Sequence, residues 1–336
     1  MLNQISSTDE KQNAWIEVKK TLHSNTIFGK IVGALLWTNE SGEDGKPLIN
    51  IDPEELVTNI NQNPWPLLEG HDPGKIVGQV LEAKLFEHEN TNKSIVGILG
   101  YYNCDRVLDF KALDLGEQIS VSSPQLLPAL PEDFHIKLQT DPREIDQEWF
   151  EISEQNSLLE FEYNEASYNA LDSMQQLITV GVPYVCFVWN PFVTSIAKEA
   201  GKDTYIAVKA WIKSLVKKAQ SLRNPIISFK SRQRDCEVTF IYRGKNINKH
   251  YLALESHHIA ALQAAKLIDN LIQREMPAKE IIYEYDAEGD KWFPLHAVLT
   301  DNRLIKSEKE LIPYEILPTN LSLGLDGNLL KETQSL

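Results

Sequence analysis

Residues 64–80, PWPLLEGHDPGKIVGQV, place a histidine, a turn and the start of a strand in direct succession. The tripeptide Asp-Pro-Gly at 72–74 favours a turn, because aspartate can accept a hydrogen bond from the backbone two residues later. Two apolar segments follow at residues 76–88 and 94–102, and the polar residues 89–92 separate them. This pattern predicts a long antiparallel pair of strands that begins directly after a histidine-bearing turn.

The flanking segments of the first half are expected to add helices and further strands. Asp52 and Pro53 are typical of a helix start and predict a helix to about residue 62, because Asp caps the first turn and proline fits its first position. Helices are also expected within residues 1–25 and at 104–115, and strands at 28–37, 118–122 and 149–153. These elements predict a small antiparallel β-barrel, or a sandwich, with flanking helices.

The second half combines long amphipathic segments with short apolar ones. Apolar residues recur at helical spacing over residues 192–221 and 255–275. Strands are expected at 226–229, 236–242, 280–285 and 292–299, and the apolar run at 182–189 predicts a buried strand or the start of a core element. Helices and strands in this order predict an α/β or α+β domain, so the whole chain is assigned to the α+β class.

The charge of the chain changes along its length. Residues 1–180 carry a net charge of −18, whereas residues 181–336 carry +3. Such a step is typical of a domain boundary. The sequence therefore predicts a helical extension at 1–25, a strand-rich domain at 26–165, an α/β accessory domain at 180–316 and an irregular tail at 317–336.

The composition excludes several classes of protein. With 42% hydrophobic and 24% charged residues, the chain is typical of a globular protein. It has no run of about 18 apolar residues that could span a bilayer, and its first residues lack the pattern of a secretory signal. Its three cysteines are far apart and odd in number, which argues against a disulfide framework. We therefore expect a cytoplasmic protein without a membrane partner.

No motif in the sequence indicates a cofactor or a metal ion. The chain contains no Gly-rich phosphate loop, no dinucleotide fingerprint and no zinc-protease motif. His257 and His258 are adjacent on a predicted helix, so their rings point in different directions, which is a poor arrangement for metal ligands. We expect neither a cofactor nor a metal site.

Three short motifs in the first half resemble those of a known family. His71 precedes a short turn and an apolar-apolar-Gly-x-apolar strand, Ser120 lies in an apolar-Ser-apolar segment after Gly116, and Glu151 opens a Glu-apolar-Ser segment. In this order and spacing they resemble the prohead maturation proteases of tailed phages, which are serine peptidases related in fold to herpesvirus assemblin. The resemblance covers about residues 26–165. It implies that His71 is the catalytic base, Ser120 the nucleophile and Glu151 the acid that orients the histidine.

The residues of this site leave two alternatives open. A serine hydroxyl needs a neighbouring base to become a nucleophile, and a carboxylate can fix the tautomer of a histidine base. Ser122, on the same predicted strand face as Ser120, or Ser123 could be the nucleophile instead. Asp72 could either close the turn or bear on His71, and the turn sequence favours the first role.

These observations predict a serine endopeptidase that cleaves protein substrates, with its own chain among the candidates. The resemblance implies a homo-oligomer or a larger assembly, and the accessory domain would recognise a substrate or partner, or regulate the peptidase. The alternatives are a catalytically inactive protease-like binding or assembly protein, and a cellular, defence-related protease rather than a capsid-maturation enzyme. Basic residues within 213–234 would suit a nucleic-acid partner, but the acidic first half argues against one.

Overall fold

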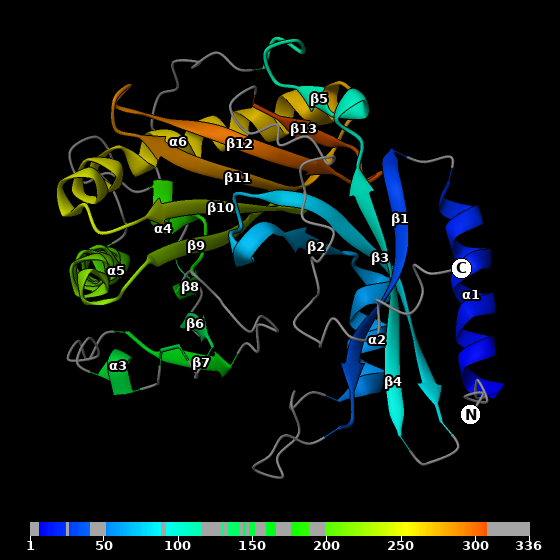
Figure 1. Ribbon diagram of the computed structural model, residues 1–336. Helices are drawn as coiled ribbons and strands as arrows, with labels where there is room; N and C mark the ends of the chain where they lie inside the picture. Colours follow the sequence, from blue (N-terminus) through cyan, green and yellow to red (C-terminus); the bar gives the residue numbers. More distant parts are fainter. Residues whose placement is uncertain are drawn as a thin grey trace.

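The computed structural model consists of two β-sheets and the helices that pack on them (Figure 1). It describes residues 7–24, 27–40, 52–88, 92–115, 130, 134–141, 144–145, 148–151, 159–165, 176–188 and 199–307. Within these ranges, one sheet has four strands and the other has nine. The chain therefore has an α+β fold, in agreement with the class predicted from the sequence.

The smaller sheet has the strand order β1-β4-β3-β2, and all neighbouring strands in it are antiparallel. Its strands are β1 (Phe28–Thr38), β2 (Trp65–Leu68), β3 (Ile76–Glu87) and β4 (Lys93–Tyr102). β3 and β4 are the long antiparallel pair that the sequence predicted, with Val80 opposite Leu99. α1 (Ser7–His23) and α2 (Pro53–Gln62) cover opposite faces of this sheet (Figure 1).

α2 has the bounds that its capping residues predicted. The side chain of Asp52 accepts hydrogen bonds from the backbone N–H groups of Glu54 and Glu55, each at 2.9 Å. Such an N-cap contributes about 1 kcal/mol to helix stability. Leu56 and Ile60, one turn apart, are buried against the smaller sheet. The cap and the apolar face therefore fix both the start and the orientation of the helix.

The larger sheet has the strand order β5-β13-β12-β11-β10-β9-β8-β6-β7. Neighbours are parallel in the pairs β5/β13, β10/β11, β8/β9 and β6/β7, and antiparallel elsewhere. The strands are β5 (Leu108–Asp109), β6 (Ile136–Thr140), β7 (Phe161–Glu165), β8 (Gln176–Gly181), β9 (Pro225–Gln233), β10 (Cys236–Arg243), β11 (Ala278–Asp286), β12 (Lys291–Leu299) and β13 (Leu304–Lys306).

Helices cover one face of the larger sheet and provide two of its crossovers. α5 (Glu199–Lys218) and η3 (Ala219–Ser221) lie between β8 and β9 in the chain, and α6 (Ile247–Gln273) joins β10 to β11 (Figure 1). Parallel neighbours require such connections, because a tight hairpin can join only antiparallel strands. The short α4 (Val185–Val188) packs against α6. None of the helices in the described residues is long and apolar enough to cross a membrane.

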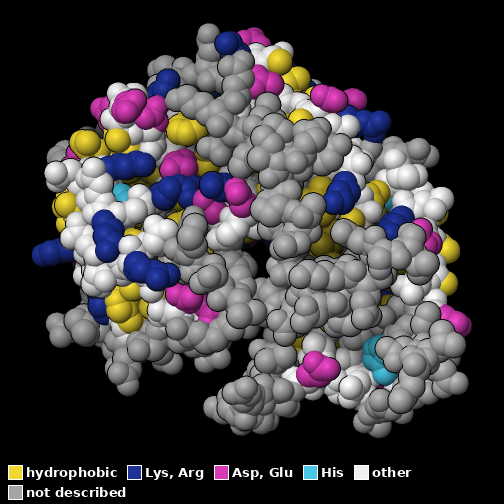
Figure 2. Space-filling model, in the orientation of Figure 1, with side chains coloured by type: hydrophobic (Ala, Val, Ile, Leu, Met, Phe, Trp, Pro, Cys, Tyr) yellow, Lys and Arg dark blue, Asp and Glu magenta, His cyan; other side chains and the backbone are white. Residues whose placement is uncertain are grey.

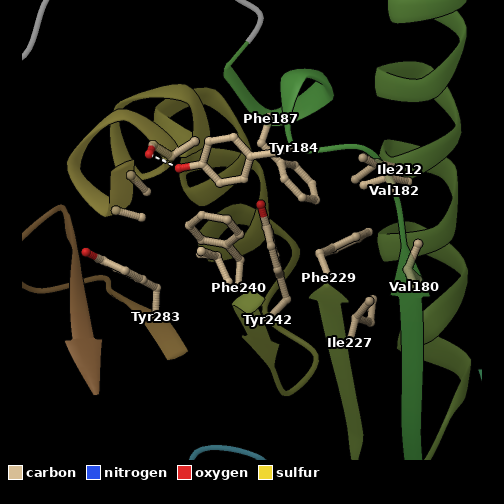
Figure 3. Close-up of a cluster of buried hydrophobic side chains, with 14 of the residues drawn as sticks. Val180, Val182, Tyr184, Phe187, Ile212, Ile227, Phe229, Phe240, Tyr242 and Tyr283 are labelled. Atoms are coloured by element: carbon tan, nitrogen blue, oxygen red, sulfur yellow. Dashed lines mark hydrogen bonds between the residues drawn. The ribbon is translucent and has the colours of Figure 1, made fainter. Parts of the chain in front are cut away.

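The main core lies between these helices and the larger sheet. Along β10, the side chains of Val238, Phe240 and Tyr242 belong to this core, whereas Ile241 packs in a separate cluster on the opposite face. This alternation follows from the two-residue period of a strand. Figure 3 shows the core side chains of β8, β9, β10 and α5 pointing toward one another.

The two sheets meet along β12 and β13. Val298 and Leu304 of the larger sheet pack in one buried cluster with Phe28, Ile76 and Tyr102 of the smaller sheet. Ile76 is the first residue of β3. The junction therefore places the start of β3, and the turn that precedes it, against the larger sheet.

The smaller sheet is open, and the expected closed barrel does not occur among the described strands. Its outer strands are β1 and β2, and β2 has only four residues. The barrel expectation assigned every strand of the first half to a single sheet. The structure instead assigns β5, β6 and β7 to the larger sheet, which thus crosses the boundary suggested between residues 165 and 180.

Three segments have a different secondary structure from the one expected. Residues 104–115 form η2 (Cys104–Arg106), β5 and a turn instead of a helix, because β5 pairs with β13. The segment expected as a strand at 149–153 begins in α3 (Glu148–Glu151), with Phe150 buried and in ring contact with Tyr163. The run at 182–189, expected as a buried strand or the start of a core element, enters α4, a helix of the main core, rather than a strand. The strand expected at 118–122 lies outside the described residues.

Candidate functional site

His71 lies in a short turn between β2 and β3 whose main chain is fixed by backbone hydrogen bonds. It ends the single 3₁₀ turn η1 (Glu69–His71), in which Gly70 has a φ of 59°, a left-handed value that favours glycine. The backbone N–H of Glu69 donates to the carbonyl of Lys75 at 3.0 Å. The backbone N–H of Lys75 donates to the backbone carbonyl of Asp72 at 2.9 Å. We call residues 69–75 the His71 turn. The structure describes the main chain of His71 but not its side chain.

Asp72 closes this turn, as its sequence predicted. Its Oδ1 accepts a hydrogen bond from the backbone N–H of Gly74 at 2.9 Å. Its side chain is completely buried, and its Oδ2 accepts a hydrogen bond from Nη1 of Arg243, the last residue of β10. The carboxylate is therefore engaged by the turn on one side and by the larger sheet on the other.

Arg243 joins two acidic residues at the junction of the two sheets. Its Nε and Nη2 donate to the two carboxylate oxygens of Glu284 on β11, at 3.1 and 3.2 Å. Burial alone would lower the pKa of Arg243, but the hydrogen bonds to Asp72 and Glu284 outweigh it and raise the pKa. We call Asp72, Arg243 and Glu284 the Arg243 bridge. Figure 2 shows that basic and acidic side chains also lie next to one another on the surface over the larger sheet.

A second buried polar group, on β12 and β13, contacts the chain directly after the His71 turn. Lys306 is buried and donates from Nζ to the carbonyl of Ile76 at 3.0 Å. Its register partner across the two strands is His296. Burial, assisted by the positive charge of Lys306, lowers the pKa of His296 to about 3, so this ring is neutral at pH 7.

The proposed orienting acid Glu151 is the last residue of α3. Around it, the indole Nε1 of Trp149 donates to Ser221 Oγ at 3.4 Å, and Phe150 contacts Tyr163 of β7. Figure 1 shows α3 beside β6 and β7, apart from the turn between β2 and β3. The structure therefore does not bring the main chain of α3 to the His71 turn, and the packing of α3 gives the orienting role no support.

The proposed nucleophile, Ser120, lies outside the described residues, as do its alternatives Ser122 and Ser123. Their distances to the His71 turn are therefore not part of the site geometry. The part of the site that the structure describes is the main chain that carries His71 and the groups that fix it.

Sequence reasoning did not identify Arg243 and Glu284 as site residues. Arg243 is 171 positions away from Asp72, and no sequence motif connects the two residues. The available signal was a charged residue in an apolar strand, because Glu284 interrupts the buried run of β11. Such a residue on a buried strand usually has a partner of opposite charge.

His257 and Cys186 are part of the packed core. His257 is buried, stacks on Phe187 and Trp292, and has its Nδ1 within 2.9 Å of the Tyr242 hydroxyl. Burial raises the pKa of the Cys186 thiol to about 12, so it is not a ready nucleophile. Among the described residues, no group of three or more His, Cys, Asp and Glu side chains could hold a metal ion.

Several cations of the basic segment at 213–234 interact within the chain. Lys230 pairs with Glu237 at 2.7 Å, and Arg234 pairs with Asp269 at 2.6 Å. Lys218 Nζ lies 4.6 Å from the ring centre of Trp149. These contacts account for part of the positive charge that suggested a nucleic-acid surface.

No protein-family model, curated protein or solved structure matches this chain.

Proposed function

We propose that the chain is a serine endopeptidase in which His71 is the general base and Ser120 the nucleophile. The observation that carries the proposal is the His71 turn: its backbone hydrogen bonds fix the main chain of His71 directly before β3 of an antiparallel sheet. A catalytic base needs such a preorganised support, because its proton transfer requires a fixed geometry. The order of the three motifs along the sequence supports Ser120 as the nucleophile.

The proposed reaction is acyl transfer to serine followed by hydrolysis. Ser120 Oγ attacks the peptide carbonyl carbon while its proton passes to His71. The C–N bond then breaks as His71 returns the proton to the leaving amine. A water molecule, deprotonated by the same histidine, then attacks the acyl carbon. The bond to Ser120 Oγ breaks, His71 returns the proton to that oxygen, and the second product leaves as a carboxylic acid. Protein segments are the proposed substrates, the chain's own sequence among them, and the proposed active form is a homo-oligomer.

The proposed mechanism also needs an acidic side chain that orients His71. The resemblance assigns the role to Glu151, whereas Asp72, the acid next to His71 in the chain, already binds Gly74 and Arg243. If Glu151 has this role, Glu151→Gln lowers the rate of the reaction. If it does not, the variant behaves as the wild type.

A fluorophosphonate probe tests the proposed nucleophile and base together. The chain would be labelled and the adduct mapped by mass spectrometry, in the wild type, Ser120→Ala and His71→Ala, with the half-buried His258→Ala as a histidine control. We expect an adduct on Ser120 that requires His71 and survives His258→Ala. An adduct on Ser122 or Ser123 would still support a peptidase, with that serine as its nucleophile.

An inactive protease-like binding or assembly protein is the second candidate. The position of α3 beside β7 and η3 favours it, because this position separates the main chain near Glu151 from the His71 turn. This candidate predicts no His71-dependent adduct in any assembly state of the wild-type chain. Absence of the adduct from both the monomeric and the oligomeric fractions would therefore overturn the peptidase.

A further inference from the structure

The larger sheet contacts the His71 turn at two points and the residue that follows the turn at a third. Arg243 donates to Asp72, and Lys306 donates to the carbonyl of Ile76 directly after the turn. At the remaining point the packing is close: a Cβ on Gly74 would lie 2.8 Å from Cδ1 of Leu295 on β12. The turn that carries His71 is therefore seated on strands that lie far from it in the sequence.

Among these contacts, Arg243 also connects the turn to the start of α6. It is the last residue of β10, and its carbonyl oxygen lies 3.2 Å from Nε2 of the buried His250 on α6. Asn246 caps α6 by accepting from the backbone N–H of Lys249 at 3.1 Å, and Nζ of Lys249 lies 3.9 Å from Glu284. A shift at the junction of β10 and α6 would therefore act on the guanidinium that binds Asp72.

The chemistry of the bridge requires arginine at this position. A guanidinium presents several N–H donors in a rigid plane. It can therefore form two hydrogen bonds with one carboxylate and a further hydrogen bond with a second carboxylate. Arg243 uses Nε and Nη2 for Glu284 and Nη1 for Asp72. Because Asp72 is fully buried, loss of this donor would leave a buried carboxylate without its charged partner.

We propose that Arg243 is a positioning residue for the peptidase: by binding Asp72, the residue next to His71, it allows the larger sheet to control the placement of the catalytic base. The inference rests on the proposed function and adds a positioning role for the second half of the chain.

The test measures labelling by a fluorophosphonate as two constants, the maximal rate kinact and the half-saturating concentration KI. It compares the wild type, Arg243→Ala and Arg243→Lys at a temperature at which circular dichroism shows each to be folded. We expect Arg243→Ala to lower kinact about tenfold to a hundredfold with an unchanged KI, because small displacements of a catalytic group have effects of this size. Arg243→Lys keeps the charge without the fork and should recover part of the loss.

Two further measurements separate positioning from stability. The control Arg234→Ala removes an exposed ion pair with Asp269 and should leave kinact unchanged. Amide hydrogen exchange at Gly74 and Lys75, whose N–H groups bind within the turn, should accelerate in Arg243→Ala. Two results in Arg243→Ala would overturn the positioning role without affecting the proposed peptidase. One is faster amide exchange with an unchanged kinact, and the other is unchanged amide exchange. A wild-type chain without a His71-dependent adduct would overturn the peptidase, and the positioning role with it.

Discussion

His296 on β12 is a buried histidine whose environment keeps it neutral. Burial and the neighbouring charge of Lys306 lower its pKa to about 3, whereas the ring in the unfolded chain has a pKa of about 6.5. Below pH 6.5 the unfolded chain therefore binds a proton that the folded chain rejects. The stability that this residue contributes is complete above pH 6.5 and is lost as the pH falls toward 3.

We predict that His296→Gln flattens the dependence of stability on pH. Between pH 7 and pH 5, proton uptake by the unfolded His296 should cost the wild type about 2 kcal/mol of unfolding free energy, which the variant does not lose. Urea denaturation at the two pH values measures the difference. The half-buried His258 provides the control, and His258→Gln should change the pH dependence less. Parallel stability curves for the wild type and His296→Gln would contradict the prediction.

At the residue scale, local chemistry could be predicted and long-range partners could not. The role of Asp72 in its turn followed from the neighbouring Pro73 and Gly74, because the hydrogen bond spans two residues. Its second partner, Arg243, is 171 residues away, and no spacing rule connects the two. The pairing is a consequence of how the two sheets meet.

At the element scale, the close approach of β3 and β4 depends on glycine. A Cβ on Gly78 would lie 2.3 Å from the backbone carbonyl oxygen of Gly100 on the neighbouring strand. Backbone cannot move aside as the end of a flexible side chain can. The start of β3, which follows the His71 turn, therefore requires glycine at residue 78.

We predict that Gly78→Ala destabilises the chain by about 3 kcal/mol or more, since overpacking against backbone forces the strands to shift. Gly181→Ala on β8 is the control: its added Cβ would lie 3.2 Å from the Cβ of Lys137, so its cost should be smaller. Thermal or urea unfolding of the purified variants measures both costs. Equal stability of Gly78→Ala and the wild type would contradict the close approach of the two strands.

Elements with complete local signals were predicted well, and short ones were not. α2 has an N-cap, a proline at its first position and an apolar face, and all three act within one helix. α3 and β5 contain four and two residues, too few to show a period. Their structure depends on contacts with distant segments, such as the pairing of β5 with β13.

At the scale of the whole molecule, the first half of the chain completes a sheet formed mostly by the second half. β5 pairs with β13 at one edge, and β6 pairs with β8 near the other. The step in charge near residue 180 therefore does not coincide with a boundary in the larger sheet. Composition reports the surface charge of a segment, whereas sheet membership depends on pairing between distant strands.

We predict that residues 1–165 do not fold on their own. The fragment would retain β5 and β6 without β13 and β8, and would expose Ile76 and Tyr102, which pack on the larger sheet. Urea denaturation followed by circular dichroism should show no cooperative transition, and co-expression with residues 166–336 should restore one. A sharp transition of the isolated fragment would show that it is an independent domain.

The distance between Ser120 Oγ and the nearer ring nitrogen of His71, measured in a crystal structure of the chain, tests the proposed peptidase most directly. A nucleophile and its base must lie within hydrogen-bond reach, about 2.6–3.2 Å or somewhat longer without substrate. We predict a distance in this range, with the His71 turn bound to Arg243 as described above. A separation greater than about 6 Å, too long for a single bridging water, would contradict the proposal.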